Sequence, residues 1–427
     1  MAPRTGLTRR SPFGGNPAVG ERGASTQRRI LDVGLEVFAE HGYHETGVEL
    51  IADAAGCSRP AFYQYFSSKQ DLFWQLAAQL GGEMGELAES IDAITPDDAG
   101  VAGVRAWLDE FIDLCGRYDP ILTGYQAARR ESRPTTRDTR NIGNRVGAAL
   151  IQAAGGDHPE LDRPALTNTV VAVVMRSIDY WRIGVGQLSR ARFVDGMSKT
   201  VHRLLHGAID GVNVTKATKA PPRRAPAWPE VPGSSHHPAN LRARGLRTRQ
   251  ALLDAGTAVL PVHGYHATRV DDIVEAAGVS HGSFYRYFAN KDELFHALAE
   301  HAALTMVELV DTFPEDVAPD AIRSWLDAWF AAYRSNGGVI SAWQEIGGDD
   351  AEVRAFSLDV ALVAFDRLRR IVHRRGFGDD AVDAVVLLAV VERMPYSVLS
   401  LQHIREDEAV DASTFIVHRG LFGLDDR

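Results

Sequence analysis

Apolar residues along this chain recur at the spacing of a helix rather than in the alternation of a strand. Across residues 26–41, Ile30, Val37 and Phe38 fall on one face, and Gly42 follows where a left-handed residue would end a helix. No stretch of the sequence shows sustained alternation of apolar and polar residues. We therefore predict an all-helical protein.

Capping residues predict the next helices. Thr46 and Glu49 have the spacing of a capping box, which would open a short helix. Ser58 can cap the following helix, in which Pro60 falls in the first turn, where its missing N–H is not needed. Ser68 has cap spacing too and opens a long helix. Two short helices in this order predict a helix-turn-helix motif.

The same signals return 222 positions later, as Ser58 and Ser280 show. Thr268 pairs with Asp271 as a capping box, and Asn290 caps the second long helix. One departure is Pro261, which lies in the last turns of the first helix of this copy and predicts a bend there.

The repeat continues beyond these motifs with a slowly changing offset. Trp107 corresponds to Trp325, 218 positions later, and residues 201–203 correspond to residues 417–419, 216 positions later. We expect six segments: a disordered basic N-terminal arm at 1–24, a helix-turn-helix domain at 25–72, a helical domain at 73–210, a Pro-rich basic linker at 211–244, a second helix-turn-helix domain at 245–294 and a second helical domain at 295–427.

Charge changes the picture because it is unevenly distributed. The chain has a net charge of −10, but residues 1–30 hold six arginines against Glu21, and residues 211–250 hold eight basic side chains against Glu230. Basic segments therefore precede both helix-turn-helix motifs. This suits a protein that meets DNA with one face, although solvated tails would have the same composition.

Other chemistry is absent from the sequence pattern. The two cysteines, Cys57 and Cys115, have no metal-type spacing, and the His41/His44 pair and its copy lack a third ligand nearby. We find no nucleophile elbow, phosphate loop or dinucleotide fingerprint, so we predict no enzyme, cofactor or metal. Apolar runs are too short to span a membrane and no signal peptide is evident, so we expect a cytoplasmic protein.

Residues 54–72 (AAGCSRPAFYQYFSSKQDL) and 276–294 (AAGVSHGSFYRYFANKDEL) together resemble the TetR family of bacterial repressors, and do so twice. The resemblance implies two units, each with an N-terminal three-helix DNA-binding domain and a helical ligand-binding and dimerisation domain. In that family the last two long helices of each unit form a four-helix interface. The corresponding segments here are 164–184, 193–209, 381–404 and 412–424. One chain would then be its own pseudo-dimer; the rival arrangement is a further homodimer of tandem chains.

The resemblance also implies roles for the residues of the motif. Phosphate contacts are expected from Thr46, Tyr63, Tyr65 and Lys69, and from Thr268, Tyr285, Tyr287 and Lys291. Base contacts are expected from Arg59, Ala61 and Gln64, and from His281, Ser283 and Arg286, in helices capped by Ser58 and Ser280. The tyrosines would otherwise be half-buried surface residues. Phe62 and Phe66, with their copies, are expected to be core rather than a stacking platform for bases.

The base readers differ between the two copies, which predicts an operator with unlike half-sites rather than a palindrome. The two reading helices should lie about 34–36 Å apart, one turn of DNA. Aromatic side chains in each half could also line a pocket for a small apolar inducer, or be ordinary core. These are Trp107, Phe111, Tyr118, Tyr125, Tyr180, Trp325, Trp329, Tyr333, Trp343, Phe365 and Tyr396.

Three functions therefore remain open. The first is a transcriptional repressor that a small apolar ligand releases from its double-stranded DNA operator. The second is an architectural DNA-binding protein that responds to no ligand. The third is a protein that sequesters a small molecule and whose DNA-binding domains are idle.

Overall fold

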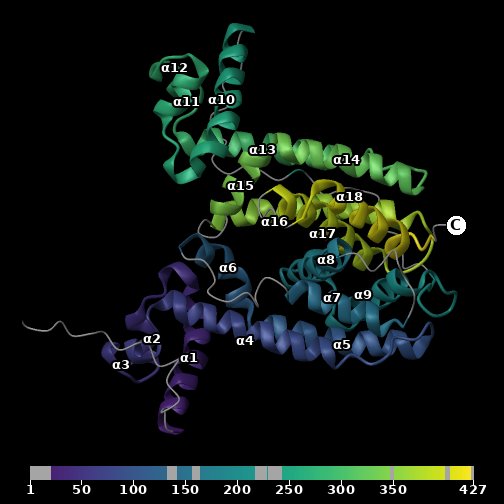
Figure 1. The fold of residues 1–427 in the computed structure, drawn as a ribbon. Coiled ribbons are helices and arrows are strands. Elements are labelled where there is room, and N and C mark those ends of the chain that lie inside the picture. Colours follow the sequence, from purple (N-terminus) through teal and green to yellow (C-terminus); the bar gives the residue numbers. More distant parts are fainter. Residues whose placement is uncertain are drawn as a thin grey trace, which may run out of the picture. The chain divides into compact units, whose positions relative to one another are not determined.

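The structure is a computed structural model that describes residues 21–131, 142–155, 164–216, 228, 243–346, 351–399 and 404–424. Nearly all of the expected N-terminal arm and most of the expected linker lie outside these residues. Helices dominate, and the described residues form no β-strand, only two isolated bridges. The predicted all-helical fold is confirmed (Figure 1).

The chain divides into two compact units. One contains residues 1–92 and 106–150, and the other contains residues 93–105 and 151–427. Residues 217–242, of which only 228 is described, are the central gap of the description. The helices before this gap are α1 (Glu21–Glu45), α2 (Val48–Ala54), α3 (Arg59–Tyr65), α4 (Lys69–Glu89), α5 (Asp98–Arg117), α6 (Asp119–Glu131), α7 (Ile142–Ala153), α8 (Pro164–Arg182) and α9 (Arg190–His206), with a short 3₁₀ turn, η3 (Val185–Gln187).

The helices after the central gap repeat this order. They are α10 (Ala243–Ala267), α11 (Val270–Ala277), α12 (His281–Tyr287), α13 (Lys291–Val310), α14 (Pro319–Ser335), α15 (Gly337–Ile346), α16 (Ala351–His373), α17 (Asp380–Leu399), α18 (Glu406–Phe415) and the π-helical η4 (Ile416–Leu421). Within the described ranges, no helix is both long enough and apolar enough to cross a bilayer.

The first helix of each copy breaks at the predicted glycine. Gly42 has φ 73° and Gly264 has φ 72°, values that favour glycine because it lacks a Cβ. Helix α10 continues through Pro261 and departs from helical φ/ψ at Gly264, and the bend at Pro261 stays a prediction.

The predicted capping boxes at Thr46 and Thr268 are wrong by one residue. The N-caps are Gly47 and Arg269, and each threonine hydroxyl instead donates to the carbonyl of the preceding glycine at 2.6 Å. Each buried hydroxyl donates to an orphan carbonyl at the end of the first helix, and the second helix begins one residue later than predicted, at Val48 and at Val270. The caps at Ser58, Ser68, Ser280 and Asn290 are confirmed.

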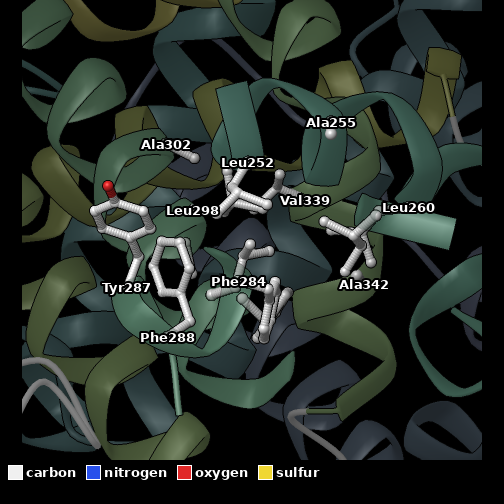
Figure 2. Close-up of a cluster of buried hydrophobic side chains, with 14 of the residues drawn as sticks. Leu252, Ala255, Leu260, Phe284, Tyr287, Phe288, Leu298, Ala302, Val339 and Ala342 are labelled. Atoms are coloured by element: carbon white, nitrogen blue, oxygen red, sulfur yellow. The ribbon is translucent and has the colours of Figure 1, made fainter. Parts of the chain in front are cut away.

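Each helix-turn-helix domain has its own aromatic core. In the first copy, Phe62 and Phe66 are fully buried, and Phe38 packs edge-on against Phe73 of α4. In the second copy, Phe284 and Phe288 lie in a cluster with residues of α10, α13 and α15 (Figure 2). The i, i+4 phenylalanines thus anchor both short helices, as predicted, and are not exposed for base stacking.

The second unit contains a bundle to which both halves contribute. Helix α8 packs against α17 and α18, and α9 packs against α17 and η4. These are the four segments expected to form an interface, and their facing sides are apolar, with Val171, Val174, Val385 and Val386 buried. The halves are therefore joined by a shared hydrophobic core as well as by the peptide chain.

A buried histidine holds α9 to the preceding segment of its unit. His202 Nε2 lies 2.8 Å from the carbonyl oxygen of Thr95, and its Nδ1 lies 2.8 Å from the amide of Asn213. A neutral ring with its proton on Nε2 satisfies both contacts, whereas a charged ring would place a second donor against the Asn213 amide. Burial lowers the pKa of His202 below its ordinary value of 6.5, and the contact with Thr95 only partly opposes this.

This arrangement predicts that acid destabilises the bundle. A histidine whose pKa is depressed by folding contributes stability that is fully present above the ordinary value of 6.5 and is lost as the pH falls toward the folded-state pKa. The free energy of unfolding, measured with urea, should therefore fall between pH 7 and pH 5. His202→Asn should flatten this part of the profile, and an unchanged slope in the variant would contradict the assignment.

Candidate DNA-binding interface

Two short helices, α3 and α12, present the predicted DNA-binding residues. Each begins with a serine cap: Ser58 Oγ accepts from the N–H of Ala61, and Ser280 Oγ accepts from the N–H of Ser283, both at 3.3 Å. Tyr63 is 42% exposed and its counterpart Tyr285 is 57% exposed. Large aromatic side chains of folded proteins are more often mostly buried. Each helix therefore has one buried face of phenylalanines and one face open to a partner.

The predicted base readers lie on the open face of both helices. Arg59 and Gln64 are exposed on α3, as are His281 and Arg286 on α12. Ala61 and Ser283 are half-buried, and the caps Ser58 and Ser280 are exposed. Their exposure leaves most of these side chains accessible to a partner, and their base contacts stay a prediction.

An acidic partner for each first reader was not predicted. Arg59 forms an ion pair with Glu49 of α2, and His281 Nε2 lies 2.5 Å from Asp271 Oδ1 of α11. The partners occupy equivalent positions of the repeat, 222 residues apart, as Glu49 and Asp271 show. An acid and a base conserved in position between the two copies was the sequence signal that could have revealed these pairs.

The threonines after the first helix of each copy and the lysines at the start of the long helices α4 and α13 are engaged inside the protein. Thr46 and Thr268 are buried, with their hydroxyls on the glycine carbonyls described above. Lys69 Nζ donates to the carbonyl of Tyr43 at 2.8 Å and lies 4.6 Å from the centre of the Tyr43 ring. Lys291 makes the same contacts with Tyr265, at 2.8 Å and 4.3 Å. These ammonium groups complement the carbonyl end of the first helix, and their predicted phosphate contacts stay a prediction.

The second tyrosine of the motif differs between the copies. Tyr65 is half-buried, whereas Tyr287 is only 6% exposed and lies beside Phe288 in the core of the second domain (Figure 2). The exposed area available to a phosphate is therefore larger at Tyr63 and Tyr285 than at Tyr287.

Most of the predicted pocket aromatics are core residues with internal partners. The indole N–H groups of Trp107 and Trp325 donate at 3.0 Å to the carbonyls of Leu87 and Leu309, which are equivalent positions of the repeat. Further contacts join Trp107 to Phe111, Tyr118 to Glu83, Tyr125 to Trp74, Tyr180 to Arg176, Trp329 to Val391, Trp343 to Phe356 and Tyr396 to Arg393; Phe365 is buried near Gly186.

Tyr333 is the exception in this set. Its ring is buried on α14, and its hydroxyl has no hydrogen-bond partner among the described residues. Burial raises the pKa of Tyr333 well above its ordinary value, and nearby Glu392 raises it further. A buried unpaired hydroxyl costs free energy, so Tyr333 is the candidate polar group for a bound molecule. The described residues contain no cluster of three potential metal ligands.

Comparison with known proteins agrees with this geometry. Residues 30–76 and 252–298 each match the N-terminal domain of the bacterial regulatory proteins of the tetR family. These two ranges contain α2, α3, α11 and α12 in full, and therefore all of the predicted DNA-binding residues.

Individual relatives match over short stretches. The HTH-type transcriptional activator FasR of Mycolicibacterium smegmatis is 47% identical over 64 residues, which are 14% of this chain and 29% of that protein. The HTH-type transcriptional repressor AcnR of Corynebacterium glutamicum is 34% identical over 70 residues, 16% of this chain and 37% of that protein. A solved structure of the fatty acid degradation regulator FadR from Bacillus halodurans aligns with 45% of this chain and 98% of that chain, at 17% identity and a TM-score of 0.33.

The chain thus spans between 29% and 37% of the length of these two curated relatives. The matched family and the named relatives are transcriptional regulators rather than enzymes, which confirms the prediction of a non-enzymatic protein. The resemblance to the TetR family is confirmed in both halves. The chain is therefore a tandem TetR-like protein, with one TetR N-terminal domain in each half.

Proposed function

We propose that the protein is a DNA-binding transcriptional repressor whose two halves read different half-sites of one operator. The observation that carries the proposal is the pair of capped helices, α3 and α12, whose open faces bear unlike readers. A helix of this kind inserts its N-terminal part into the major groove, where Arg can bind guanine and Gln can bind adenine through two hydrogen bonds each. The named relatives include both an activator and a repressor. That this protein represses transcription is therefore part of what we propose.

The Arg59–Glu49 ion pair and the His281–Asp271 contact set the energetics of reading. On binding, Arg59 exchanges Glu49 for a base edge, and His281 exchanges Asp271. The pairs are exposed, so breaking them costs little, and a matching base more than offsets the loss. Against a mismatched base the acid keeps its partner, which lowers the cost of a mismatch, so discrimination depends on how far the matched base contact exceeds the internal pair.

Selection of binding sites from random DNA tests the proposed function. The expected result is one recurring sequence with two unlike half-sites whose centres lie about one helical turn apart. A perfect inverted repeat would contradict the asymmetric operator. Equal affinity for unrelated sequences at matched salt would instead support an architectural DNA-binding protein.

Arg59→Ala should relax the preference at one base pair and weaken operator binding by about 1–3 kcal/mol. The matched control is Glu49→Gln, which frees Arg59 without removing it and should bind the operator at least as tightly. Fluorescence anisotropy against a panel of single-base operator variants measures both effects. If Arg59→Ala lowered the affinity for every sequence by the same factor, Arg59 would be a phosphate contact and not a reader.

We further propose that a small apolar ligand controls DNA binding from the helical part of the second half. Support comes from the unpaired hydroxyl of Tyr333, which is buried on α14 with Glu392 of α17 nearby, and from the packing of α14 against α17. A ligand that binds one arrangement of the bundle more tightly than another would shift the separation of the two reading helices. If no ligand affected operator binding, the alternative of an unregulated DNA-binding protein would be favoured.

Tyr333→Phe should raise the free energy of unfolding by about 1 kcal/mol in the absence of ligand, because it removes a buried group that has no partner. Tyr118→Phe is the matched control: its hydroxyl donates to Glu83 Oε1 at 2.5 Å, so its loss should destabilise by a similar amount. Urea unfolding of both variants gives the comparison. Destabilisation of Tyr333→Phe would mean that the hydroxyl is already satisfied.

We also propose that α8, α9, α17, α18 and η4 take the place of the four-helix interface of a dimer, so that one chain is a pseudo-dimer. Support comes from the packing of these helices within one compact unit. Light scattering should then give a molar mass close to the 46.6 kDa of one chain. Twice that mass would favour a homodimer of tandem chains that presents four readers.

A further inference from the structure

The bundle pairs each helix with its own counterpart in the repeat. Helix α8 begins at Pro164 and α17 at Asp380, and α9 begins at Arg190 and α18 at Glu406, both 216 positions apart. The contacts of α8 with α17, and of α9 with η4, are therefore contacts between equivalent surfaces, as in a two-fold symmetric dimer. At the centre of such an interface, a residue meets its own counterpart.

Among the described residues, Arg176 and Leu204 each meet their own counterpart, and in both cases the pair is unlike. Arg176 of α8 corresponds to Glu392 of α17, and Arg176 Nε lies 2.7 Å from Glu392 Oε2. Leu204 of α9 corresponds to Gly420 of η4, and a Cβ placed on Gly420 would lie 3.6 Å from Leu204 Cδ1. A positive side chain therefore faces a negative one, and a large side chain faces a residue without one.

A third contact, away from the centre, also joins unlike residues of the two halves. Arg192 at the start of α9 binds Asp379 through two hydrogen bonds of 2.6 and 2.9 Å. The counterpart of Arg192 in the second half is Glu408. Two second halves paired in this geometry would therefore bring Glu408 against Asp379, acid against acid.

The buried part of the interface also differs between the two halves, because its arginine–aspartate pair has no equivalent at the counterpart positions. Arg203 of α9 is 1% exposed, and its Nη2 lies 3.1 Å from Asp383 Oδ1 of α17. The counterpart of Asp383 is Thr167, whose hydroxyl donates to the carbonyl of Pro164 within its own helix. Two first halves paired in this geometry would bury Arg203 without a carboxylate, which is strongly unfavourable.

From these contacts we infer that the α8–α9 surface selects the α17–α18–η4 surface as its partner and rejects a second copy of itself. Pairing of two first halves would oppose Arg176 with Arg176 and Leu204 with Leu204. Pairing of two second halves would oppose Glu392 with Glu392 and leave a gap between two Gly420 residues. Repulsion and misfit in both like pairs, with attraction and fit in the unlike pair, are the elements of a specific interface. The inference concerns pairing alone and does not depend on whether the protein binds DNA.

The test separates the halves only after they have folded together. A protease site is inserted between residues 217 and 242 of the full chain, and the folded protein is cut. Cut protein is mixed with cut, ¹⁵N-labelled protein, dissociated in urea and diluted back. Native mass spectrometry then reports which pieces pair. The expected result is that labelled and unlabelled pieces exchange within pairs of one first half and one second half. Pairs of two first halves or of two second halves should be about tenfold or more less abundant than random pairing would give. Like pairs in the binomial proportion of random pairing would overturn the inference.

Charge reversal at the centre gives an independent readout. Glu392→Arg should weaken the association of the cut pieces by about tenfold or more, and the exchange Arg176→Glu with Glu392→Arg should restore most of it. Arg105→Gln, which removes an ion pair between α5 and Asp195 within the first half, is the control and should leave association unchanged. If the single variant does not fold, the double exchange still decides. Cut pieces that carry both Arg176→Glu and Glu392→Arg should associate nearly as tightly as the unchanged pieces, and association about tenfold or more weaker would overturn the inference.

Discussion

Asp383→Asn is expected to lower the free energy of unfolding by about 3–5 kcal/mol, the largest loss we predict for a single substitution in the bundle. The Asp383 carboxylate is 1% exposed and accepts from Arg203 at 3.1 Å, from the Thr200 hydroxyl at 2.5 Å and from Arg375. An asparagine keeps the shape but leaves two buried guanidinium groups without a counter-charge. Urea or thermal unfolding of the full chain measures the effect.

The matched control is Asp195→Asn, which removes an acid of the same bundle that lies at the surface beside Arg105 and Lys199. It should change stability by less than about 1 kcal/mol, because exposed ion pairs contribute little. Replacing Arg203, Asp383 and Arg375 together by apolar residues of similar volume should recover much of the loss. If Asp383→Asn were no worse than Asp195→Asn, the buried network would not hold the bundle together.

Gly282→Glu is expected to weaken operator binding by about 100-fold or more while leaving the fold intact. Gly282 lies in the first turn of α12, and a Cβ added there would meet nothing within 4 Å. An acidic side chain in the first turn also suits the helix dipole, so stability should not suffer. On DNA the same carboxylate would face phosphates, and the second reading helix would be lost from a two-part site.

Gly282→Gln has nearly the same size and no charge, and it should bind the operator within about threefold of the unchanged protein. Binding curves at two salt concentrations distinguish repulsion from misfit, because only repulsion is screened by salt. Equal binding by Gly282→Glu and the unchanged protein would mean that α12 does not enter the DNA groove.

Helix caps and core positions were predictable because they depend on neighbours in sequence. Ser58, Ser280 and the i, i+4 phenylalanines act within one turn of their own helix, and the structure confirms them. Thr46 was misassigned because its hydroxyl donates to the carbonyl of Gly42 at the end of the first helix, and the N-cap of the next helix is Gly47. Sequence spacing identifies the residue that can cap, but not which orphan group lies nearest.

Contacts between distant segments could not be read in the same way. Arg59 and Glu49 are ten positions apart on different helices, and Arg203 meets Asp383 only when the two halves pack. Tyr333 and Tyr118 are both predicted pocket tyrosines, yet only the Tyr118 hydroxyl has a partner among the described residues. Such differences depend on the turn geometry and on the packing of whole helices, which periodicity does not determine.

The covalent link between counterpart helices affects how operator occupancy depends on the concentration of the protein. A homodimeric regulator loses its binding-competent form on dilution, because each dimer must assemble from two molecules. If one chain is a pseudo-dimer, as proposed, the packing of α8 on α17 takes place within one molecule, and the fraction of competent protein is independent of its abundance. Occupancy of an operator should then depend on the first power of the chain concentration rather than on its square.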